Sequence, residues 1–289
     1  MSGRCRRAVA LAVLLTALAT ACADNGGGTA DAASNPTATP TTVPMTTTST
    51  PPGGRQPTAE EPLRVIFAGD SVMAEFAPAM IEALQGTGQS VGRFVLSPSI
   101  ARDGAANLIW QQELAEQDPE LIVNLVGFWE DQVVGETASS EPGWAQRYRT
   151  RVVEPFLDRI TAEGAKVLWI GMAAVDDPVV TERFARMNSV YARVAEERDD
   201  VDYLPAGDYL SGPEGGYADI VASPTTGAPV RLRRTDGLHL CPEGIALLGA
   251  PVLERIAAQW NVSGAFGWQQ GDWRRPPLLH APEECPAPV

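Results

Sequence analysis

The sequence contains few of the basic residues that bind nucleic acids and few of the histidines and cysteines that bind zinc. Its 22 lysine and arginine residues are outnumbered by 36 aspartate and glutamate residues, so the net charge at pH 7 is −14. A chain this acidic has no general attraction for nucleic acids, and we expect no nucleic-acid partner. Only two histidines are present, and no cysteines or histidines have the spacing of a zinc site. The sequence also lacks a glycine-rich phosphate-binding loop, so it predicts neither a metal nor a cofactor.

Long apolar segments are lacking as well. The N-terminal apolar run, residues 8–19, is too short to remain as a membrane-spanning helix. Three arginines precede it and small residues lead up to Cys22, which is typical of an export signal over residues 1–22. A lipobox would leave a lipid-anchored Cys22 on the outer side of the cell membrane, although Ala19 stands where leucine is usual. The alternative, an ordinary cleavage site, would release a secreted protein.

Residues 23–60 are rich in threonine, proline, alanine, serine and glycine and contain almost no large apolar side chains. Such a composition cannot bury enough surface to fold. We therefore predict a disordered linker, which favours the lipid-anchored interpretation, ahead of a folded domain over residues 61–260. Residues 261–289 carry several prolines and three aromatic side chains, and we expect them to pack on that domain.

Cys241 and Cys285 are the only cysteines beyond the export signal. In the oxidising environment outside the cell, two such cysteines favour a disulfide, which would hold the C-terminal tail beside His239. The alternative is a metal site formed by these two cysteines with His239 and His280, although their spacing does not support it.

Short apolar runs alternate with helix-like segments from Leu63 onward. The runs expected to form strands are residues 63–68, 91–96, 120–126, 166–171 and 201–204. The segments expected to form helices are residues 72–85, 104–116, 144–163, 181–198 and 243–259. This alternation predicts an α/β fold, with a parallel sheet covered by helices on both faces. Residues 205–235, rich in proline and glycine, are expected to form one long loop.

The first predicted strand ends in Gly69-Asp70-Ser71, immediately before a predicted helix. A serine at the start of a helix lies beside N–H groups that favour a developing oxyanion. Much later, Asp236 and His239 lie three residues apart in a short loop. Because an imidazole can take the proton of a serine hydroxyl and a carboxylate can orient that imidazole, Ser71, His239 and Asp236 are candidates for a catalytic triad. The alternative for His239 is a structural histidine that caps the following helix.

A Gly-Asp-Ser turn after the first strand, followed near the C-terminus by Asp-x-x-His, resembles the SGNH/GDSL hydrolase superfamily of esterases, lipases and carbohydrate acetylesterases or acetyltransferases. The resemblance covers residues 62–260. With the N-terminal signal, it points to an exported lipoprotein of the actinobacterial type. It implies a three-layer α/β/α sandwich with a parallel, flavodoxin-like sheet. It also implies that Asp70 is not the triad acid and instead holds the turn by accepting backbone hydrogen bonds.

In this superfamily the oxyanion hole usually combines the serine N–H with a glycine after the second strand and an asparagine in a Gly-x-Asn-Asp motif after the third. Here the third predicted strand leads into Gly127-Phe-Trp-Glu130, so Trp129 replaces the asparagine. The resemblance therefore assigns the oxyanion hole to Ser71, Gly104, Gly127 and Trp129. The indole N–H of Trp129 can substitute as a donor, or its ring can instead form an aromatic wall.

Three arginines, Arg231, Arg233 and Arg234, directly precede Asp236. Beside a catalytic loop they can clamp an anionic part of a substrate. In a chain this acidic, pairing with surface carboxylates is the favoured interpretation.

Together with the resemblance, these residues predict an exported serine esterase that acts on acyl or acetyl esters of a cell-wall glycan or a lipid. Two alternatives remain open. An O-acyltransferase would use the same triad and pass the acyl group to a sugar hydroxyl, whereas a non-catalytic lipoprotein would bind glycan through surfaces such as Trp129. The expected partners are the ester substrate and, through a lipid on Cys22, the membrane.

Overall fold

The computed structural model describes residues 54–103, 108–138, 141–275 and 282–288. The predicted export signal with Cys22, most of the predicted linker, Gly104 and His280 lie outside these residues. Contacts divide the chain after Thr47, and all described residues belong to the second unit, Thr48–Val289. Among them, no helix is both long and apolar enough to cross a bilayer.

Five parallel strands form the central sheet in the order β2-β1-β3-β4-β5. They are β1 (Leu63–Gly69), β2 (Ser90–Leu96), β3 (Leu121–Leu125), β4 (Lys166–Gly171) and β5 (Val201–Pro205). The central strands β1, β3 and β4 are buried along almost their whole length because both faces of the sheet are covered. Each predicted strand is present, with ends that differ by at most one residue.

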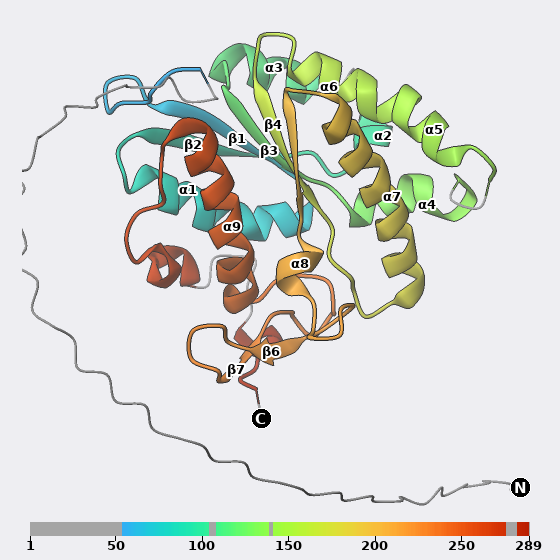
Figure 1. Ribbon diagram of the computed structural model, residues 1–289, viewed down its shortest axis with the longest axis vertical. Helices are drawn as coiled ribbons and strands as arrows, with labels where there is room; N and C mark the ends of the chain where they lie inside the picture. Colours follow the sequence, from blue (N-terminus) through green and yellow to red (C-terminus); the bar gives the residue numbers. More distant parts are fainter. Residues whose placement is uncertain (1–53, 104–107, 139–140, 276–281, 289) are drawn as a thin grey trace, which may run out of the picture. The chain divides into compact units, whose positions relative to one another are not determined.

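Helices cover both faces of this sheet (Figure 1). On one face, α1 (Ser71–Gln85) packs against α9 (Pro242–Trp260). The other face carries α3 (Leu108–Gln117), α6 (Glu154–Ile160) and α7 (Pro178–Glu197), as right-handed crossovers between parallel strands require. These three layers confirm the predicted α/β/α sandwich.

Aromatic side chains fill the face covered by α3, α6 and α7. The indole of Trp169 on β4 stacks on Tyr191 of α7 with a centroid separation of 4.3 Å. On its other side it meets Phe156 of α6 at 6.2 Å, and Phe156 meets Trp110 of α3 at 5.5 Å. All four rings are buried, so they join three helices to the sheet through one continuous apolar contact.

The helix predicted over residues 144–163 is not continuous. It is divided into α5 (Trp144–Tyr148), a π-helical turn (Arg149–Val153) and α6. The interruption lies just before Pro155, which has no N–H to donate to a carbonyl in the preceding turn. The helix predicted over residues 104–116 is likewise only partly correct, because α3 begins at Leu108 and a separate short helix, α2 (Ile100–Asp103), precedes it.

The helix that follows β3 was not predicted. α4 (Phe128–Ala138) follows β3, and its apolar residues do not recur on one face, so the sequence carries no amphipathic signal. Tertiary contacts hold it instead. Its buried Asp131 forms an ion pair with Arg183 of α7 at 2.6 Å, and α4 and α7 pack together.

The region 205–235 is not the single long loop that its glycines and prolines predicted. It contains the short helix α8 (Gly207–Leu210) and an antiparallel hairpin of β6 (Ile220–Ala222) with β7 (Pro229–Arg231). The hairpin turn is closed by two hydrogen bonds between the backbones of Ser223 and residues 227–228. These elements are too short to show a periodic pattern in the sequence.

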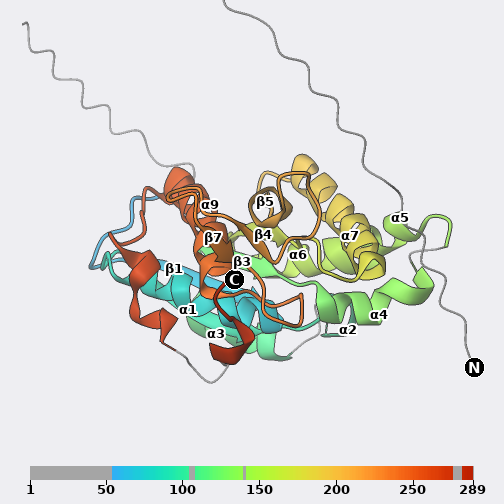
Figure 2. The ribbon, with the colours of Figure 1, turned by 90° about the horizontal axis from the view of Figure 1, so that it is seen from below.

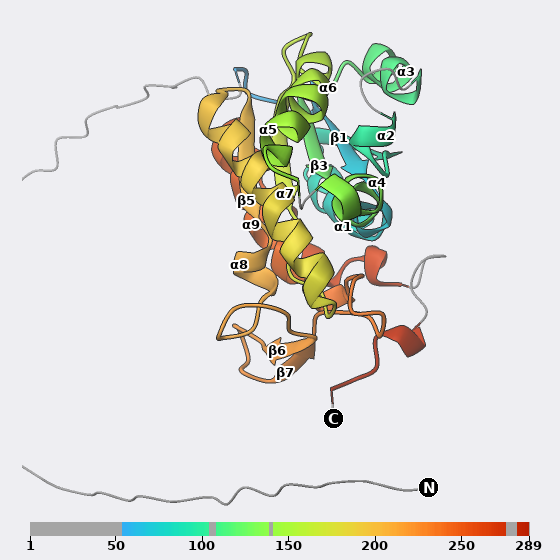
Figure 3. The ribbon, with the colours of Figure 1, turned by 90° about the vertical axis from the view of Figure 1, so that its right-hand side faces the viewer.

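The segment after α9 packs against α1 through two tryptophan side chains. Trp268 and Trp273 are buried, whereas Phe266 is fully exposed. The carboxylate of Glu82 on α1 accepts hydrogen bonds from the N–H groups of Asp272 and Trp273, at 2.8 and 2.7 Å. Figure 3 shows that residues 282–288 lie on the same side of the domain as the β6–β7 hairpin.

Gly69→Ala is expected to lower the free energy of unfolding by about 3 kcal/mol. A Cβ at this position would lie 1.9 Å from the carbonyl oxygen of Leu125 at the end of β3, and 2.6 Å from the Cβ of Met73. The matched control is Gly207→Ala, because the nearest atom to its added Cβ is 3.8 Å away. Urea denaturation followed by circular dichroism measures both variants, and wild-type stability for Gly69→Ala would contradict this packing.

Candidate active site

Ser71 is the first residue of α1 and follows directly on the end of β1. Asp70 caps the helix, since its Oδ1 accepts a hydrogen bond from the N–H of Val72 at 3.0 Å. The serine is half-buried at the carboxyl edge of the parallel sheet. Sites in such sheets form at this edge, and the helix N-terminus there favours negative charge.

The carboxylate of Asp70 also joins β1 to the end of β3. Its Oδ2 accepts hydrogen bonds from the N–H groups of Gly127 and Phe128, at 3.2 and 3.1 Å. Complete burial raises the pKa of Asp70, while the hydrogen bonds from Val72, Gly127 and Phe128 oppose that rise. The prediction that Asp70 holds the turn through backbone hydrogen bonds is confirmed.

Ser71, His239 and Asp236 form one continuous line of hydrogen bonds. The Nε2 of His239 lies 2.8 Å from the Oγ of Ser71, and its Nδ1 lies 2.6 Å from the Oδ2 of Asp236. The other carboxylate oxygen of Asp236 accepts from the N–H groups of Leu238 and His239, at 2.9 and 3.0 Å. The structure therefore brings together the three side chains that the sequence singled out, in the order that nucleophile, base and orienting acid require.

Hydrogen bonds keep Asp236 in its charged form. Partial burial alone would raise its pKa, but the hydrogen bonds donated by Leu238 and His239 outweigh that effect and lower the pKa below the ordinary value. A charged Asp236 fixes the Nδ1–H tautomer of His239, which leaves Nε2 free to accept a proton from Ser71.

The turn from Asp236 to His239 is tightly packed. Gly237 has a φ of +71°, and a Cβ there would meet the carboxylate of Asp176. Buried Arg233 donates to the carbonyl oxygens of Leu238 and Ala174, at 3.1 and 3.3 Å, which ties the turn to the segment after β4. Burial lowers the pKa of Arg233 to about 10.

The other two arginines of the predicted cluster pair with carboxylates, although one of these carboxylates, Glu75, is buried and does not lie on the surface as the favoured interpretation expected. Arg231 pairs with Asp219 at 2.9 Å. Arg234 pairs with Glu75 on α1 and with Glu284 near the C-terminus. The sequence did not specify the partners of Arg234, because Glu75 lies 159 residues away along the chain.

Of the four residues predicted for the oxyanion hole, the described contacts test only Gly127. The N–H of Gly127 donates to Asp70, so it does not point toward the acyl site, and this assignment is wrong. Trp129 is 46% exposed at the start of α4, and its ring lies edge-on to Phe128 at 5.8 Å. Ser71 retains its position at the helix N-terminus, while Gly104 lies outside the described residues.

Glu130, which stands where the superfamily motif has aspartate, has a structural role. It is buried and accepts hydrogen bonds from the Oγ of Ser99 at 2.7 Å, the N–H of Ala101 at 3.1 Å and the hydroxyl of Tyr148 at 2.6 Å. Burial raises its pKa, and the hydrogen bonds from Ser99 and Tyr148 oppose that rise. Glu130 therefore fastens the segment after β2 to α4 and α5.

Cys241 and Cys285 form a disulfide, as predicted. Cys241 lies at the start of α9, two residues after His239. Because both sulfurs are bonded to each other, they cannot serve the alternative metal site with His239 and His280. Within the described residues, no cluster of three or more histidine, cysteine, aspartate or glutamate side chains is arranged to hold a metal ion.

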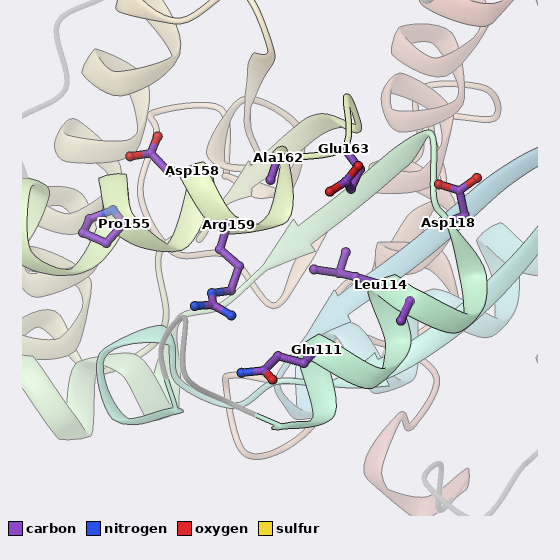
Figure 4. Close-up of a pocket in the computed structure, with 9 residues that line it drawn as sticks. Gln111, Leu114, Asp118, Pro155, Asp158, Arg159, Ala162 and Glu163 are labelled. Carbon is purple, nitrogen blue, oxygen red and sulfur yellow. The ribbon is translucent and has the colours of Figure 1, made fainter.

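A hollow of about 950 Å³ lies elsewhere, between α3 and α6 (Figure 4). Gln111 of α3 and Arg159 of α6 project into the space between the two helices. None of the residues that line it belongs to the Ser71 site, so this hollow does not contribute to the chemistry there.

Fold and site together define an α/β protein with a serine, histidine and aspartate aligned at the carboxyl edge of its parallel sheet. The chain belongs to the family described as "Protein of unknown function (DUF459)", whose sequence model matches residues 64–255. This match includes Ser71, Asp236 and His239. A comparison with curated proteins finds no match.

Several solved structures resemble this one. An acetyl-xylooligosaccharide esterase from Geobacillus has a TM-score of 0.47 and 14% identity, over 68% of this chain and 94% of that chain. A carbohydrate esterase of family 3 from Talaromyces cellulolyticus has a TM-score of 0.43 and 15% identity, over 67% and 97% of the two chains. A member of the lipolytic G-D-S-L family from Veillonella parvula has a TM-score of 0.43 and 13% identity, over 66% and 96%. Because the sequence identities and TM-scores are this low, the function has to be derived from the site itself.

Asp70→Asn is expected to lower the free energy of unfolding by about 2–4 kcal/mol, because an amide nitrogen would replace the oxygen that faces two buried N–H donors. The matched control is Asp177→Asn at the start of α7. Asp177 accepts from Val179 and Val180 through one oxygen only, at 2.8 and 3.2 Å, and asparagine supplies that oxygen equally well. Chemical denaturation of both variants measures the difference, and equal losses would contradict the role of the second Asp70 oxygen.

Glu75 is expected to make stability depend on pH. Burial raises its pKa from 4.5 to about 7, although the charges of His239 and Arg234 act in the opposite direction. The folded protein therefore holds a proton that the unfolded chain has lost, and stability must fall as the pH rises from 4.5 to about 7. The melting temperature of the wild type, relative to Glu75→Gln, should fall across this window. Glu163→Gln, on an exposed glutamate, is the control. A difference in melting temperature between wild type and Glu75→Gln that does not change with pH would contradict the raised pKa of Glu75.

Proposed function

We propose that this protein is a serine hydrolase that cleaves acyl esters. The observation that carries the proposal is the line of hydrogen bonds from Ser71 through His239 to Asp236. A hydroxyl is a weak nucleophile until a base accepts its proton, and this arrangement places a suitable base at hydrogen-bond distance. A purely structural histidine has no need of a half-buried serine aligned with its second ring nitrogen.

In the acylation step, the Oγ of Ser71 attacks the carbonyl carbon of the ester while the Nε2 of His239 takes the hydroxyl proton. Asp236 stabilises the imidazolium that forms. The carbonyl oxygen becomes an oxyanion beside the backbone N–H of Ser71, at the positive end of α1. His239 then gives its proton to the departing alcohol oxygen, which leaves an acyl group on Ser71.

In the deacylation step, a water molecule gives its proton to His239 and attacks the acyl carbon. The bond to the Oγ of Ser71 breaks, the proton returns to the serine, and a carboxylic acid leaves. An O-acyltransferase would follow the same path with a sugar hydroxyl in place of water. The exposed ring of Trp129, near the start of α4, offers a flat surface suited to a sugar.

We also propose that the protein works outside the cytoplasm, on esters of a cell-wall glycan or a lipid. The basic and apolar N-terminus that leads to Cys22 supports export, and the disulfide between Cys241 and Cys285 is typical of an oxidising compartment. A lipid on Cys22 would retain the domain at the membrane at the end of its linker.

Ser71→Ala and His239→Ala are each expected to lower kcat for 4-nitrophenyl acetate by about 10⁴-fold, because each removes a member of the acyl-transfer machinery. The matched controls are Ser263→Ala, on an exposed serine, and His280→Ala, the other histidine of the chain. Both controls should keep wild-type activity. Ester hydrolysis that survives in Ser71→Ala would rule out the proposed nucleophile.

Adding a sugar acceptor separates hydrolysis from transfer. If the wild-type protein is a hydrolase, it should release free acetate at the same rate with or without the acceptor. Acetylated sugar as the main product, detected by mass spectrometry and lost in Ser71→Ala, would identify the transferase instead.

A further inference from the structure

The turn that carries Asp236 and His239 is closed by the backbone of Arg234. The N–H of Arg234 donates to the carbonyl oxygen of His239 at 2.9 Å, and the N–H of Gly237 donates to the carbonyl oxygen of Arg234 at 3.0 Å. Arg234 therefore forms the base of the turn, and a displacement of Arg234 displaces the imidazole.

The side chain of Arg234 connects this turn to two other parts of the molecule. It pairs with Glu75 on α1 and with Glu284 near the C-terminus. Glu75 is 4% exposed and comes four residues after Ser71, one helical turn further along α1. One guanidinium thus links the turn that carries the histidine to the helix that carries the serine.

Glu284 belongs to a short segment, residues 283–286, which we term the C-terminal strap. The carbonyl oxygen of Glu284 accepts a hydrogen bond from the N–H of Thr235 at 3.0 Å. The carbonyl oxygen of Pro286 accepts one from the Nε of Arg231 at 2.7 Å. Between them, Cys285 is covalently bonded to Cys241. Viewed from the hairpin end, the C-terminal residues lie beside β7 (Figure 2).

Several charged groups surround the imidazole of His239. Asp236 lies on its own turn, while Asp70 and Glu75 face it from the beginning of α1. Arg234 lies at the base of the same turn and pairs with Glu284, while Arg233 and Asp176 pack against the turn from its other side. Changes of charge in this group therefore alter the electrostatic surroundings of the imidazole as well as its position.

We propose that Glu284 of the C-terminal strap is a positioning residue, which acts through Arg234 and Glu75 to hold the imidazole of His239 against Ser71. The proposal rests on the proposed function, because its effect is on proton transfer from Ser71. A guanidinium is a planar group with a fixed fork of donors, so carboxylates on two different elements restrain its orientation. A catalytic imidazole must be held to within about 0.5 Å of its working position, and the strap supplies part of that restraint.

Glu284→Gln in the full chain tests the restraint. We expect kcat for 4-nitrophenyl acetate to fall about 10-fold while KM changes less than about twofold, because the substrate is bound as before and the base is misplaced. The matched control is Glu283→Gln, the exposed neighbouring residue, which should retain wild-type kinetics. Circular dichroism and the melting temperature show that each variant is folded at the assay temperature.

The pH profile of kcat/KM distinguishes two explanations for a lower kcat. Glu284 either positions His239 and interacts with it through its charge, or its loss merely loosens the turn that carries His239. Glu284→Gln removes a negative charge near His239, so its acid limb should move to lower pH by about half a unit. Glu75→Gln should leave the acid limb in place, because burial keeps Glu75 protonated, and so uncharged, up to a pH of about 7. Arg234→Gln removes a positive charge, so its acid limb should move to higher pH. Loosening alone would lower all three profiles without moving the limbs of Glu284→Gln and Arg234→Gln in opposite directions, and that result would overturn the proposal.

The two proposals fail in different ways. If Ser71→Ala retains full activity, the serine hydrolase function itself is wrong. If Ser71→Ala is inactive while Glu284→Gln has wild-type kcat and an unmoved acid limb, the hydrolase stands and the C-terminal strap has no positioning role.

Discussion

The buried carboxylate of Asp70 holds together the part of the molecule on which the site depends. Three N–H groups converge on it, from Val72 at the start of α1 and from Gly127 and Phe128 after β3. The ends of the two central strands and the start of α1 are thereby fixed to one another. Because Ser71 follows Asp70 directly, the fixed backbone at Asp70 also fixes the position of the Ser71 hydroxyl at the edge of the sheet. Such a carboxylate is stable in an apolar interior only because each oxygen accepts hydrogen bonds.

The second half of the site reaches Ser71 from 168 residues further along the chain. The segment that delivers it, between β5 and α9, contains only a short helix and a small hairpin. A segment with so little regular structure gains its rigidity from individual contacts rather than from a ladder of backbone hydrogen bonds. Here those contacts are the buried guanidinium of Arg233, the paired guanidinium of Arg234 and the disulfide of Cys241.

The elements with strong local signals could be predicted from the sequence. The continuous apolar runs of β1, β3 and β4 marked buried parallel strands, and two cysteines beyond a predicted export signal marked a disulfide. α4 could not be predicted, because the ion pair of Asp131 with Arg183 replaces the amphipathic face that a pattern would reveal. The helix near Pro155 is interrupted although its apolar pattern continues, and the proline is the only local sign of the interruption.

By itself the sequence determined the strand, the turn and the helix around Ser71. It also limited the candidate bases to two histidines and placed Asp236 three residues before His239. These are properties of neighbouring residues, which backbone geometry and side-chain chemistry settle locally. Only the tertiary structure decided that the Gly127 N–H turns to Asp70 and that Glu75 and Glu284 share Arg234. A buried polar group takes its partner from whichever element packs against it, and that choice depends on the arrangement of segments far apart in the chain.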